Sequence, residues 1–368
     1  MKVVLAGGGT GGHVFPALAL ARELRARDIE ILMVGTARGL EAAVFPAEGF
    51  PLETIRVEAL RGRRIQGRAR SLALLPQALM HALAILRRHR PQVVVGVGGY
   101  AAGPVALAAV LRRIPLLIHE QNISPGFTNT VLARLADVVA VSFAETRSSF
   151  KREVVVTGNP IRREIVDAGR RKGLEAFHLE PGKMTVLVFG GSQGAHRINR
   201  AVEEALPHLM RLRDRLQFIH ATGERDHSAM EAGYRAWKGE ARVLPFIEDM
   251  ALAYAAADLA VCRAGATTIA ELTALGKPAL LVPYPFATDD HQRGNAEGLA
   301  RAGGARLIFD RDLTGPRLAL ELQELLLDDS ETIAEMGGAA RSLGRPQAAS
   351  HLADLICELG GWGQAKRE

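Results

Sequence analysis

The chain has 368 residues, enough for two domains of ordinary size. Hydrophobic residues make up 48% and charged residues 23%, which favours a substantial packed core and argues against global disorder. The formal net charge is +6, and the two cysteines, Cys262 and Cys357, are too far apart in sequence to suggest a disulfide framework or zinc site. We see no signal-peptide pattern and no apolar run long enough to span a bilayer, so we predict a soluble protein from a reducing compartment.

Short apolar runs alternate with longer helical patterns along the first half of the chain. Continuous apolar runs of this kind are typical of parallel strands buried on both faces. We therefore predict a βαβ domain over residues 1–160, closed by the Gly-Asn-Pro turn at 158–160. Its strands should lie within residues 3–9, 31–35, 93–99, 116–120 and 138–142.

The alternation restarts after this turn, which predicts a second parallel-sheet domain over residues 161–344. The fold class is thus α/β, with two Rossmann-like, doubly wound parallel-sheet domains. We expect a last helix within residues 345–368 to pack back on the first domain. Strands of the second domain should lie within residues 185–191, 218–223, 241–246, 259–265 and 279–284.

A glycine-rich loop, GGGTGGH at residues 7–13, joins the first predicted strand to the first helix. Glycine permits close backbone approach, and a helix N-terminus offers free N–H groups to an anion. The loop also satisfies GxGxxG through Gly7, Gly9 and Gly12. A dinucleotide site would need an acid at the end of the second strand, after Gly35, and we find none there. This disfavours an NAD-dependent oxidoreductase and leaves open a turn without a ligand.

Residues 61–90 contain eight arginines and no acid, and leucine and alanine cluster between the arginines. An apolar helix with basic ends can rest on an anionic membrane surface. A packing helix with solvated arginines is an equal alternative. Few aromatic residues lie among the arginines, so we do not expect a nucleic-acid partner.

A second glycine-rich loop, GGSQGA at residues 190–195, follows the first predicted strand of the second domain. Its Ser192 is placed to cap the next helix, and this alone would explain its presence. The functional alternative is a diphosphate held by the backbone amides and the Ser192 hydroxyl. One such loop in each domain suits a donor and an acceptor that both carry diphosphates.

Seven motifs, spread in order over most of the chain, together resemble the N-acetylglucosaminyltransferases of peptidoglycan synthesis. The family resemblance implies the GT-B architecture, in which two Rossmann-like domains face a cleft, and the inverting transfer of N-acetylglucosamine from UDP-GlcNAc. The implied acceptor is the C4 hydroxyl of a lipid-linked diphosphate-muramyl-pentapeptide. The motifs are GGTGGHVFPALALA (8–21), GVGGYAAGP (96–104), HEQNISPGFTN (119–129), GNPIR (158–162), GGSQGA (190–195), the segment 245–272 and DDHQRGNA (289–296).

The resemblance also implies peripheral attachment to the cytoplasmic face of the bacterial inner membrane, with anionic lipid and other cell-wall synthesis proteins as partners. It assigns uracil recognition to the backbone at Ile247 and the ribose hydroxyls to Glu271. It places Arg162, Gln292 and Asn122 on the donor. The full set implied to bind UDP-GlcNAc is Thr10, Gly11, Gly12, Asn122, Arg162, Ser192, Ile247, Ala266, Thr267, Glu271 and Gln292.

For an inverting step, a base must lie near the acceptor hydroxyl and the departing diphosphate must be stabilised. His13 is our candidate for this base, because an imidazole titrates near neutrality. Glu120 is the alternative base, and His119 is expected to be structural. No DxD-type acidic pair ends a strand, so we expect neither a metal nor another cofactor, and helix N-termini should stabilise the leaving UDP.

Three other functions are kept as alternatives. The nearest is another GT-B enzyme that uses a UDP-sugar, such as a glycolipid glycosyltransferase or a UDP-GlcNAc epimerase. More distant are the NAD-dependent oxidoreductase and a membrane-surface binding protein without catalytic activity. The last would keep the basic helix but would tolerate loss of Glu271 and Gln292.

Overall fold

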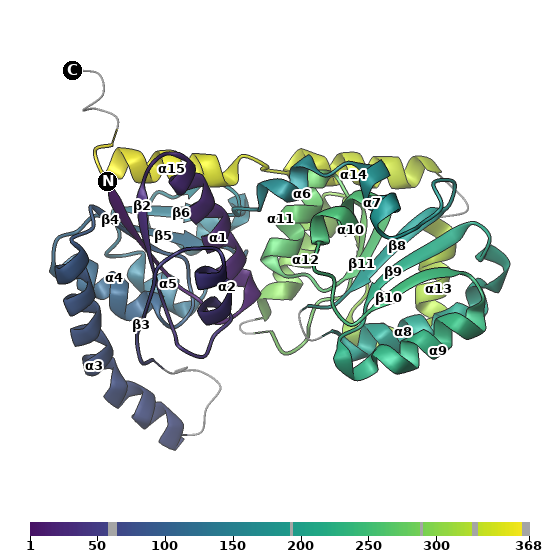
Figure 1. The fold of residues 1–368 in the computed structure, drawn as a ribbon, viewed down its shortest axis with the longest axis horizontal. Coiled ribbons are helices and arrows are strands. Elements are labelled where there is room, and N and C mark those ends of the chain that lie inside the picture. The colour runs from purple at the N-terminus through teal and green to yellow at the C-terminus, as the bar shows by residue number, and fades with distance from the viewer. Residues whose placement is uncertain (58–64, 192–193, 288–289, 326–329, 363–368) are drawn as a thin grey trace. The chain divides into compact units, whose positions relative to one another are not determined.

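The computed structural model describes residues 1–57, 65–191, 194–287, 290–325 and 330–362, and for residues 65–73 and 330 it describes the backbone alone. The chain divides into two compact units. Unit 1 contains Met1–Arg162 and the C-terminal segment from Pro346 onward, and unit 2 contains Arg163–Arg345. Each unit is a parallel sheet with helices packed against it (Figure 1).

The sheet of unit 1 has seven strands in the order β3-β2-β1-β4-β5-β6-β7, and every described pair is parallel. The strands β1, β4 and β5 are almost wholly buried, as their apolar sequences predict. The strands are β1 (Lys2–Ala6), β2 (Glu30–Gly35), β3 (Leu52–Thr54), β4 (Val93–Gly96), β5 (Leu116–Glu120), β6 (Val138–Val141) and β7 (Val155–Val156). The helices are α1 (Gly11–Ala26), α2 (Glu41–Ala47), α3 (Ile65–His89), α4 (Ala102–Leu111), α5 (Phe127–Leu132) and α15 (Ala348–Leu359).

The sheet of unit 2 has six parallel strands in the order β10-β9-β8-β11-β12-β13. The strands are β8 (Met184–Phe189), β9 (Leu216–Ala221), β10 (Glu240–Leu244), β11 (Leu259–Cys262), β12 (Ala279–Leu281) and β13 (Ala305–Leu307). The helices are α6 (Arg163–Asp167), α7 (Arg170–Ala176), α8 (His196–Ala205), α9 (His227–Trp237), α10 (Met250–Ala256), α11 (Ala266–Leu275), α12 (His291–Arg301), α13 (Gly315–Gln323) and α14 (Ser330–Leu343).

The predicted α/β class and the two parallel sheets are confirmed. The ten predicted strands are present, but most end two or three residues earlier than predicted, because the glycines, and after β10 and β12 the prolines, that follow belong to loops. Three short strands, β3, β7 and β13, were missed. Each has only two or three residues, too few to give a periodic signal.

In each sheet, the direction in which the chain adds strands reverses at the first strand of the unit. In unit 1 the chain moves outward from β1 to β2 and β3, then returns to place β4 on the other side of β1. In unit 2, β8 and β11 are related in the same way. Open α/β sheets bind ligands at the carboxyl ends of the strands beside such a switch point. The two glycine-rich loops follow β1 and β8, so each lies at the switch point of its own sheet.

The C-terminal helix α15 packs against α1 within unit 1 (Figure 1). Its buried side chains Leu352, Ala353 and Ile356 join the core that β1 and α1 share. At the edge of this contact, Arg27 at the end of α1 donates to Asp354 at 2.6 Å. The helix therefore completes the apolar cover of one face of the sheet in unit 1.

The C-terminal half of α3 is a packing helix. Ala82, Ile85 and Leu86 are buried in the core between the sheet and α4, and Ala78 is buried as well. The packing alternative in the sequence is therefore correct for this half. The arginines from Arg61 to Arg70, on which the membrane prediction mainly depends, have side chains outside the described part of the structure.

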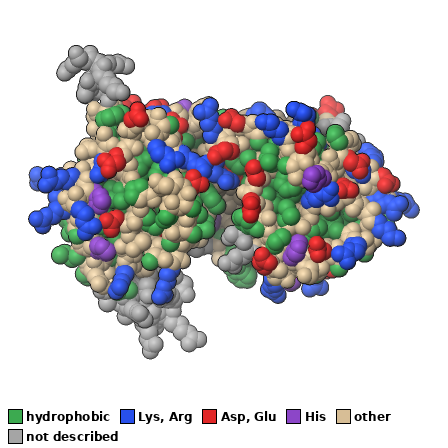
Figure 2. All heavy atoms as spheres, in the orientation of Figure 1, with side chains coloured by type: hydrophobic (Ala, Val, Ile, Leu, Met, Phe, Trp, Pro, Cys, Tyr) green, Lys and Arg blue, Asp and Glu red, His purple; other side chains and the backbone are tan. Residues whose placement is uncertain are grey.

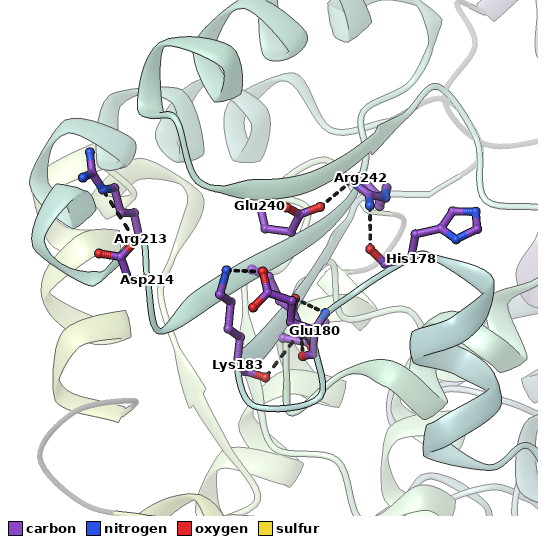
Figure 3. Close-up of polar contacts among 9 residues, drawn as sticks. His178, Glu180, Lys183, Arg213, Asp214, Glu240 and Arg242 are labelled. Atoms are coloured by element: carbon purple, nitrogen blue, oxygen red, sulfur yellow. Dashed lines mark hydrogen bonds and ion pairs between the residues drawn. The ribbon is translucent and has the colours of Figure 1, made fainter.

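A short connection between α7 and β8 is tied to the edge of the sheet in unit 2 (Figure 3). Arg242 on β10 donates to the carbonyl oxygens of Phe177 and His178, at 2.6 and 2.5 Å. Within the same connection, the Lys183 ammonium lies 2.6 Å from the Glu180 carboxylate (Figure 3). These contacts fix the entry to β8, the strand that leads into the second glycine-rich loop.

Candidate functional site

The first glycine-rich loop packs against the loop that follows β4. A Cβ added at Gly7 would lie 2.4 Å from a methyl group of Val97, and one added at Gly99 would lie 2.2 Å from the carbonyl oxygen of Gly8. Gly99 also has a φ of +82°, which favours glycine. These two glycines are therefore required by packing within the protein, whereas a Cβ at Gly9 would meet no atom within 4 Å.

Glu41 at the start of α2 holds the first glycine-rich loop from behind, and sequence reasoning missed it. Its side chain is fully buried. Oε2 accepts from the backbone N–H of Gly9 at 2.7 Å, and Oε1 accepts from the backbone N–H and the hydroxyl of Thr36 at 3.0 and 2.7 Å. Burial alone would raise the pKa of Glu41, but the hydrogen bonds from Gly9 and Thr36 outweigh it and hold the pKa below its usual value.

The Glu41 contact changes the interpretation of this loop. The N–H of Gly9 is already used by a carboxylate and is not available to a phosphate. A buried negative charge behind the loop also disfavours a second anion in front of it. The acid sought for a ribose after β2 is thus present a few residues later, but both of its oxygens are engaged with the protein.

His13 lies in the first turn of α1, three residues after the N-cap Thr10. Its side chain is half-buried, and Nδ1 lies 3.5 Å from the Thr10 hydroxyl oxygen. The opposite edge of the ring faces Gly98, where an added Cβ would lie 2.8 Å from Nε2. His13 therefore stands between the first glycine-rich loop and the loop after β4, at the switch point of unit 1.

Behind His13, two buried side chains of β5 and its following loop form a short polar chain. His119 is fully buried, and its Nε2 lies 3.0 Å from the carbonyl oxygen of Gly158. Gln121 donates through Nε2 to Nδ1 of His119 at 3.1 Å and to the carbonyl of Val97 at 2.7 Å. Burial lowers the pKa of His119 to about 4, so this ring is neutral at physiological pH.

Glu120 is a buried carboxylate that organises the loop after β5. Oε1 accepts from the backbone N–H and the side-chain amide of Asn122, at 2.9 and 3.3 Å. Oε2 accepts from the N–H of Gly126 at 3.1 Å and from the amide of Asn129 at 2.8 Å. Burial raises the pKa of Glu120, and these four hydrogen bonds oppose the rise. Because both oxygens are engaged, the geometry favours a role in holding Asn122 over that of an alternative base.

Arg162 is the last residue of unit 1. Its guanidinium lies over the ring of Phe15 on α1, 5.2 Å from the ring centroid. This contact places Arg162 close to the start of α1, the helix whose N-terminal end contains Thr10, Gly11 and Gly12.

The second glycine-rich loop turns tightly between β8 and α8. The N–H of Gly194 donates to the carbonyl of Gly191 at 2.9 Å. A Cβ on Gly194, whose φ is +75°, would lie 2.1 Å from the carbonyl oxygen of Thr222. Ser192 lies outside the described residues. The N-cap of α8 is Ala195, which has no side chain able to cap the helix.

A buried polar network lies behind this second loop. Asn199 on α8 donates to the Thr222 carbonyl at 2.7 Å and to Asp226 at 2.9 Å. Its Oδ1 lies 3.1 Å from Nε2 of His220, whose Nδ1 lies 3.1 Å from the hydroxyl of Tyr234. Burial lowers the pKa of His220 to about 3, so the ring is neutral. The network fixes α8 and the strand end between which the loop is held.

Glu271 lies inside unit 2 and is not a solvent-exposed helix residue. It is on α11 and only 7% exposed, and its Oε2 accepts from the hydroxyl of Tyr254 on α10 at 3.0 Å. The same helix begins at Ala266, followed by Thr267, directly after the switch-point strand β11. Ile247, after β10, is also buried.

Gln292 and Arg263 complete the carboxyl edge of this sheet. Oε1 of Gln292 on α12 accepts from the N–H of Tyr284 at 3.0 Å, so its amide nitrogen is the group left to meet a ligand. Arg263, missed by sequence reasoning, donates to the carbonyls of Val282 and Pro283 and to Asp310, the last at 2.6 Å. Its sequence signal was its position directly after the apolar run of β11.

The structure thus brings the expected residues together in two groups, one in each unit. In unit 1, Thr10, Gly11, Gly12, His13 and Asn122 lie in or beside loops at the carboxyl edge of the sheet. In unit 2, Ala266, Thr267, Glu271 and Gln292 follow strands at the corresponding edge. Within the described residues, no cluster of three or more histidine, cysteine, aspartate or glutamate side chains could hold a metal ion.

Two switch-point loops on two Rossmann-like sheets define a GT-B protein, and family models agree. The glycosyltransferase family 28 N-terminal domain matches residues 3–141, and the family 28 C-terminal domain matches residues 185–352. A crystal structure of MurG from Acinetobacter baumannii is similar, with a TM-score of 0.77 and 35% identity over 97% of this chain and 99% of that one. The chain belongs to glycosyltransferase family 28.

Individual relatives cover nearly the whole chain. A protein of Anaeromyxobacter dehalogenans (strain 2CP-1 / ATCC BAA-258) is 51% identical over 98% of this chain and 93% of its own length. One of Myxococcus xanthus (strain DK1622) is 48% identical over 100% of this chain and 96% of its own. Both are named UDP-N-acetylglucosamine–N-acetylmuramyl-(pentapeptide) pyrophosphoryl-undecaprenol N-acetylglucosamine transferase. A UDP-GlcNAc 2-epimerase of Neisseria meningitidis bound to UDP-GlcNAc shares the fold, with a TM-score of 0.69 but only 12% identity over 97% of this chain and 100% of that one.

Proposed function

We propose that the chain transfers N-acetylglucosamine from UDP-GlcNAc to the C4 hydroxyl of undecaprenyl-diphosphate-MurNAc-pentapeptide, with inversion at the sugar carbon. The observation that carries this proposal is the 51% and 48% identity, over nearly full length, to proteins named for this transfer. The fold alone does not separate a transferase from an epimerase, because both share it. The product is the disaccharide lipid from which peptidoglycan is built.

The donor binds mainly to unit 2 in this proposal. Glu271 accepts hydrogen bonds from the two ribose hydroxyls, and the Tyr254 hydroxyl holds its carboxylate in place. The backbone at Ile247 recognises the uracil. The amides at Ala266 and Thr267, at the start of α11, and the Ser192 loop stabilise the diphosphate as UDP leaves. The amide nitrogen of Gln292 donates to a sugar hydroxyl. No cofactor is required.

Unit 1 supplies the catalytic base and the acceptor side in this proposal. His13 takes the proton of the acceptor hydroxyl, and Asn122, held by Glu120, together with Arg162 and the backbone from Thr10 to Gly12, contacts the sugar nucleotide from this side. Glu120, the alternative base of the sequence analysis, acts in this proposal as a residue that positions Asn122. Its four donors support this role, because a base must present an oxygen to the substrate.

A lipid-linked acceptor requires access to the membrane, and unit 1 carries an apolar surface suited to it. Exposed apolar side chains lie on α3 and α4 and on or just after α5, and α4 contacts both of the other helices. Arg112, Arg113 and Arg134 are exposed in the same segments and can contact anionic headgroups. This apolar surface consists of Met80, Leu107, Leu111, Phe127, Val131 and Leu135.

This surface supports the proposal of peripheral attachment at the cytoplasmic face of the inner membrane. Figure 2 shows basic and acidic side chains interspersed on the face that it draws, so the net charge is not gathered there into one basic field. Among the described residues, no helix combines the length and apolarity that crossing a bilayer requires. Other cell-wall synthesis proteins remain proposed partners.

The function is tested with purified full-length chain, radiolabelled UDP-GlcNAc and a short-chain lipid-diphosphate-muramyl-pentapeptide. We expect release of UDP and transfer of label to the lipid in equal amounts. Omitting the lipid should stop both, which separates a transferase from an epimerase, since an epimerase acts without an acceptor. Absence of transfer from any UDP-sugar would contradict the proposal.

A further inference from the structure

The side chain of Gln121 is buried, and its neighbours determine the orientation of its amide. It is 1% exposed, and its Nε2 lies 2.7 Å from the carbonyl oxygen of Val97 and 3.1 Å from Nδ1 of His119. A carbonyl oxygen only accepts, so the nitrogen of the amide must face Val97 and the oxygen must face away from it. Both N–H groups of the amide are then in use.

The tautomer of His119 agrees with this orientation. Its Nε2 lies 3.0 Å from the carbonyl oxygen of Gly158 and must carry the proton to donate to it. In a neutral ring Nδ1 is then a free acceptor, which is what the N–H of Gln121 requires. The direction of each hydrogen bond from Gly158 to Gln121 is therefore fixed.

Oε1 of Gln121 has no hydrogen-bond partner among the described residues. Leaving a buried acceptor unpaired destabilises the folded state, so it calls for an explanation. The oxygen borders the space beside Gly98 that the ring of His13 also borders. A Cβ added at Gly98 would lie 3.3 Å from Oε1 of Gln121 and 2.8 Å from Nε2 of His13.

We propose that Gln121 is a positioning residue for His13. Its Oε1 accepts a hydrogen bond from Nε2–H of His13 in the complex with substrates, and this leaves Nδ1, on the Thr10 side of the ring, as the basic nitrogen. The proton of the acceptor hydroxyl then moves to Nδ1 and the hydroxyl oxygen bonds to C1 of the donor sugar. The bond from C1 to the diphosphate oxygen breaks, and its electron pair leaves with UDP.

The role of Gln121 resembles that of other groups that hold a catalytic imidazole in one tautomer through the nitrogen that does not react. A neutral amide fits this place, because it directs the proton to Nε2 without adding charge beside the base. This inference adds a residue role to the proposed transferase function. Only its kinetic test depends on that function being correct.

The direct test is ¹⁵N NMR of the full-length wild-type chain with labelled histidine, in the presence of UDP-GlcNAc. The signals of His13 are assigned by their loss in His13→Gln. We expect the neutral ring to carry its proton on Nε2, with Nδ1 unprotonated. A neutral ring protonated on Nδ1 overturns the proposal, and this outcome does not depend on activity.

The second test is Gln121→Met, which keeps the length of the side chain and removes its acceptor. We expect kcat to fall about 10- to 100-fold, less than the factor of about 10²–10⁴ that a positioned base contributes, because the base itself is still present. The His13 tautomer should become mixed. The KM for UDP-GlcNAc should stay within about twofold, since donor groups are untouched.

Gln217→Met is the matched control. Gln217 is a fully buried glutamine of unit 2 whose amide also donates to a backbone carbonyl, so its loss has a comparable cost in stability. We expect it to lower stability while leaving kcat and the His13 spectrum unchanged. The proposal fails if Gln121→Met behaves like this control. If wild-type chain shows no transfer, the proposed function fails instead, and the wild-type tautomer still decides the role of Gln121.

Discussion

The carboxylate of Glu41 accepts a hydrogen bond from the backbone N–H of Gly9 at 2.7 Å, which ties α2 to the loop that opens α1. Cβ atoms added at Gly8, Gly35 or Gly39 would each lie 2.0–2.6 Å from the Glu41 side chain, so the backbone closes around this carboxylate. The glycines of this region thus make room for a buried anion of the protein itself.

Replacing Glu41 with alanine should lower stability and turnover together. Three partly buried donor contacts lose their acceptor, and an unpaired buried donor costs about 1–3 kcal/mol. We expect the free energy of unfolding, measured in urea, to fall by at least about 2 kcal/mol, and kcat to fall while the KM for UDP-GlcNAc changes little. Glu48→Ala, on the same segment but half-exposed, is the control and should be near wild type. Full stability in Glu41→Ala would show that the loop does not depend on this contact.

Tyr254→Phe should weaken donor binding without affecting the chemical step. The Tyr254 hydroxyl donates to Glu271 at 3.0 Å, and a hydrogen bond to a charged group contributes about 1.5–3 kcal/mol. We expect an increase of roughly tenfold in the KM for UDP-GlcNAc, and a larger one for Glu271→Ala. Tyr234→Phe is the control. It also removes a buried hydroxyl of unit 2, but one that contacts His220 and not Glu271, so this KM should be unchanged. Equal KM values for all three variants and wild type would remove Glu271 from donor binding.

His13→Ala should lower turnover far more than donor affinity. A positioned general base contributes about 10²–10⁴ to the rate, whereas the groups proposed to bind the donor are left in place. We expect kcat to fall at least about 100-fold while the dissociation constant of UDP, measured by calorimetry, stays within about twofold. Turnover like that of wild type would exclude His13 as the base.

Placing a charge in the apolar surface of α3–α5 should weaken membrane binding. Leu111 is 59% exposed, so Leu111→Glu removes apolar contact and adds repulsion without opening the core. We expect weaker binding to vesicles that contain anionic lipid, and a smaller loss for Arg112→Glu, of about 1 kcal/mol at low salt. Leu320→Glu is the control, because Leu320 is 46% exposed on unit 2. If Leu111→Glu and Leu320→Glu bind vesicles equally, the membrane surface lies elsewhere.

Buried histidines should make stability fall as the pH is lowered below neutrality. The pKa values of His119 and His220 are lowered to about 4 and about 3 in the folded chain, from 6.5 for an ordinary histidine. Between these limits the unfolded chain binds more protons, so stability is present above pH 6.5 and is lost as the pH falls toward 4. The loss approaches about 1.4 kcal/mol per pH unit for each histidine.

This pH dependence is measured by urea unfolding at several values between pH 7.5 and 5, with His220→Asn as the comparison. The variant should be less stable at neutral pH but should show a shallower loss of stability on acidification. Parallel curves for wild type and variant would show that His220 does not titrate on unfolding.

Much of this fold follows from local patterns. The strands β1, β4, β5, β8 and β11 are continuous apolar runs buried on both faces, and such runs can be read without a structure. The glycine loops were found for the same reason, since each follows a strong strand signal. The family motifs identified Glu271 because they fix its place relative to the loop after β11.

The supporting residues could not be predicted in the same way. In the sequence, Glu41 is an ordinary acidic residue at the start of a helix. Its role in holding the glycine-rich loop becomes visible only in the fold, where α2 brings it to Gly9, which is far away in sequence. The contact between Arg263 and Asp310 is equally non-local. Gln121 lies within a recognised motif, yet its role depends on Val97 and His119 from neighbouring strand ends.

The most direct test of the central claim is the structure of the product made from UDP-GlcNAc and the lipid-diphosphate-muramyl-pentapeptide. The mass of the lipid should rise by one N-acetylhexosamine unit, and NMR should show a β linkage to C4 of the muramyl sugar. An unchanged lipid, with UDP-GlcNAc consumed by epimerisation or hydrolysis, would contradict the assignment of this chain as the transferase.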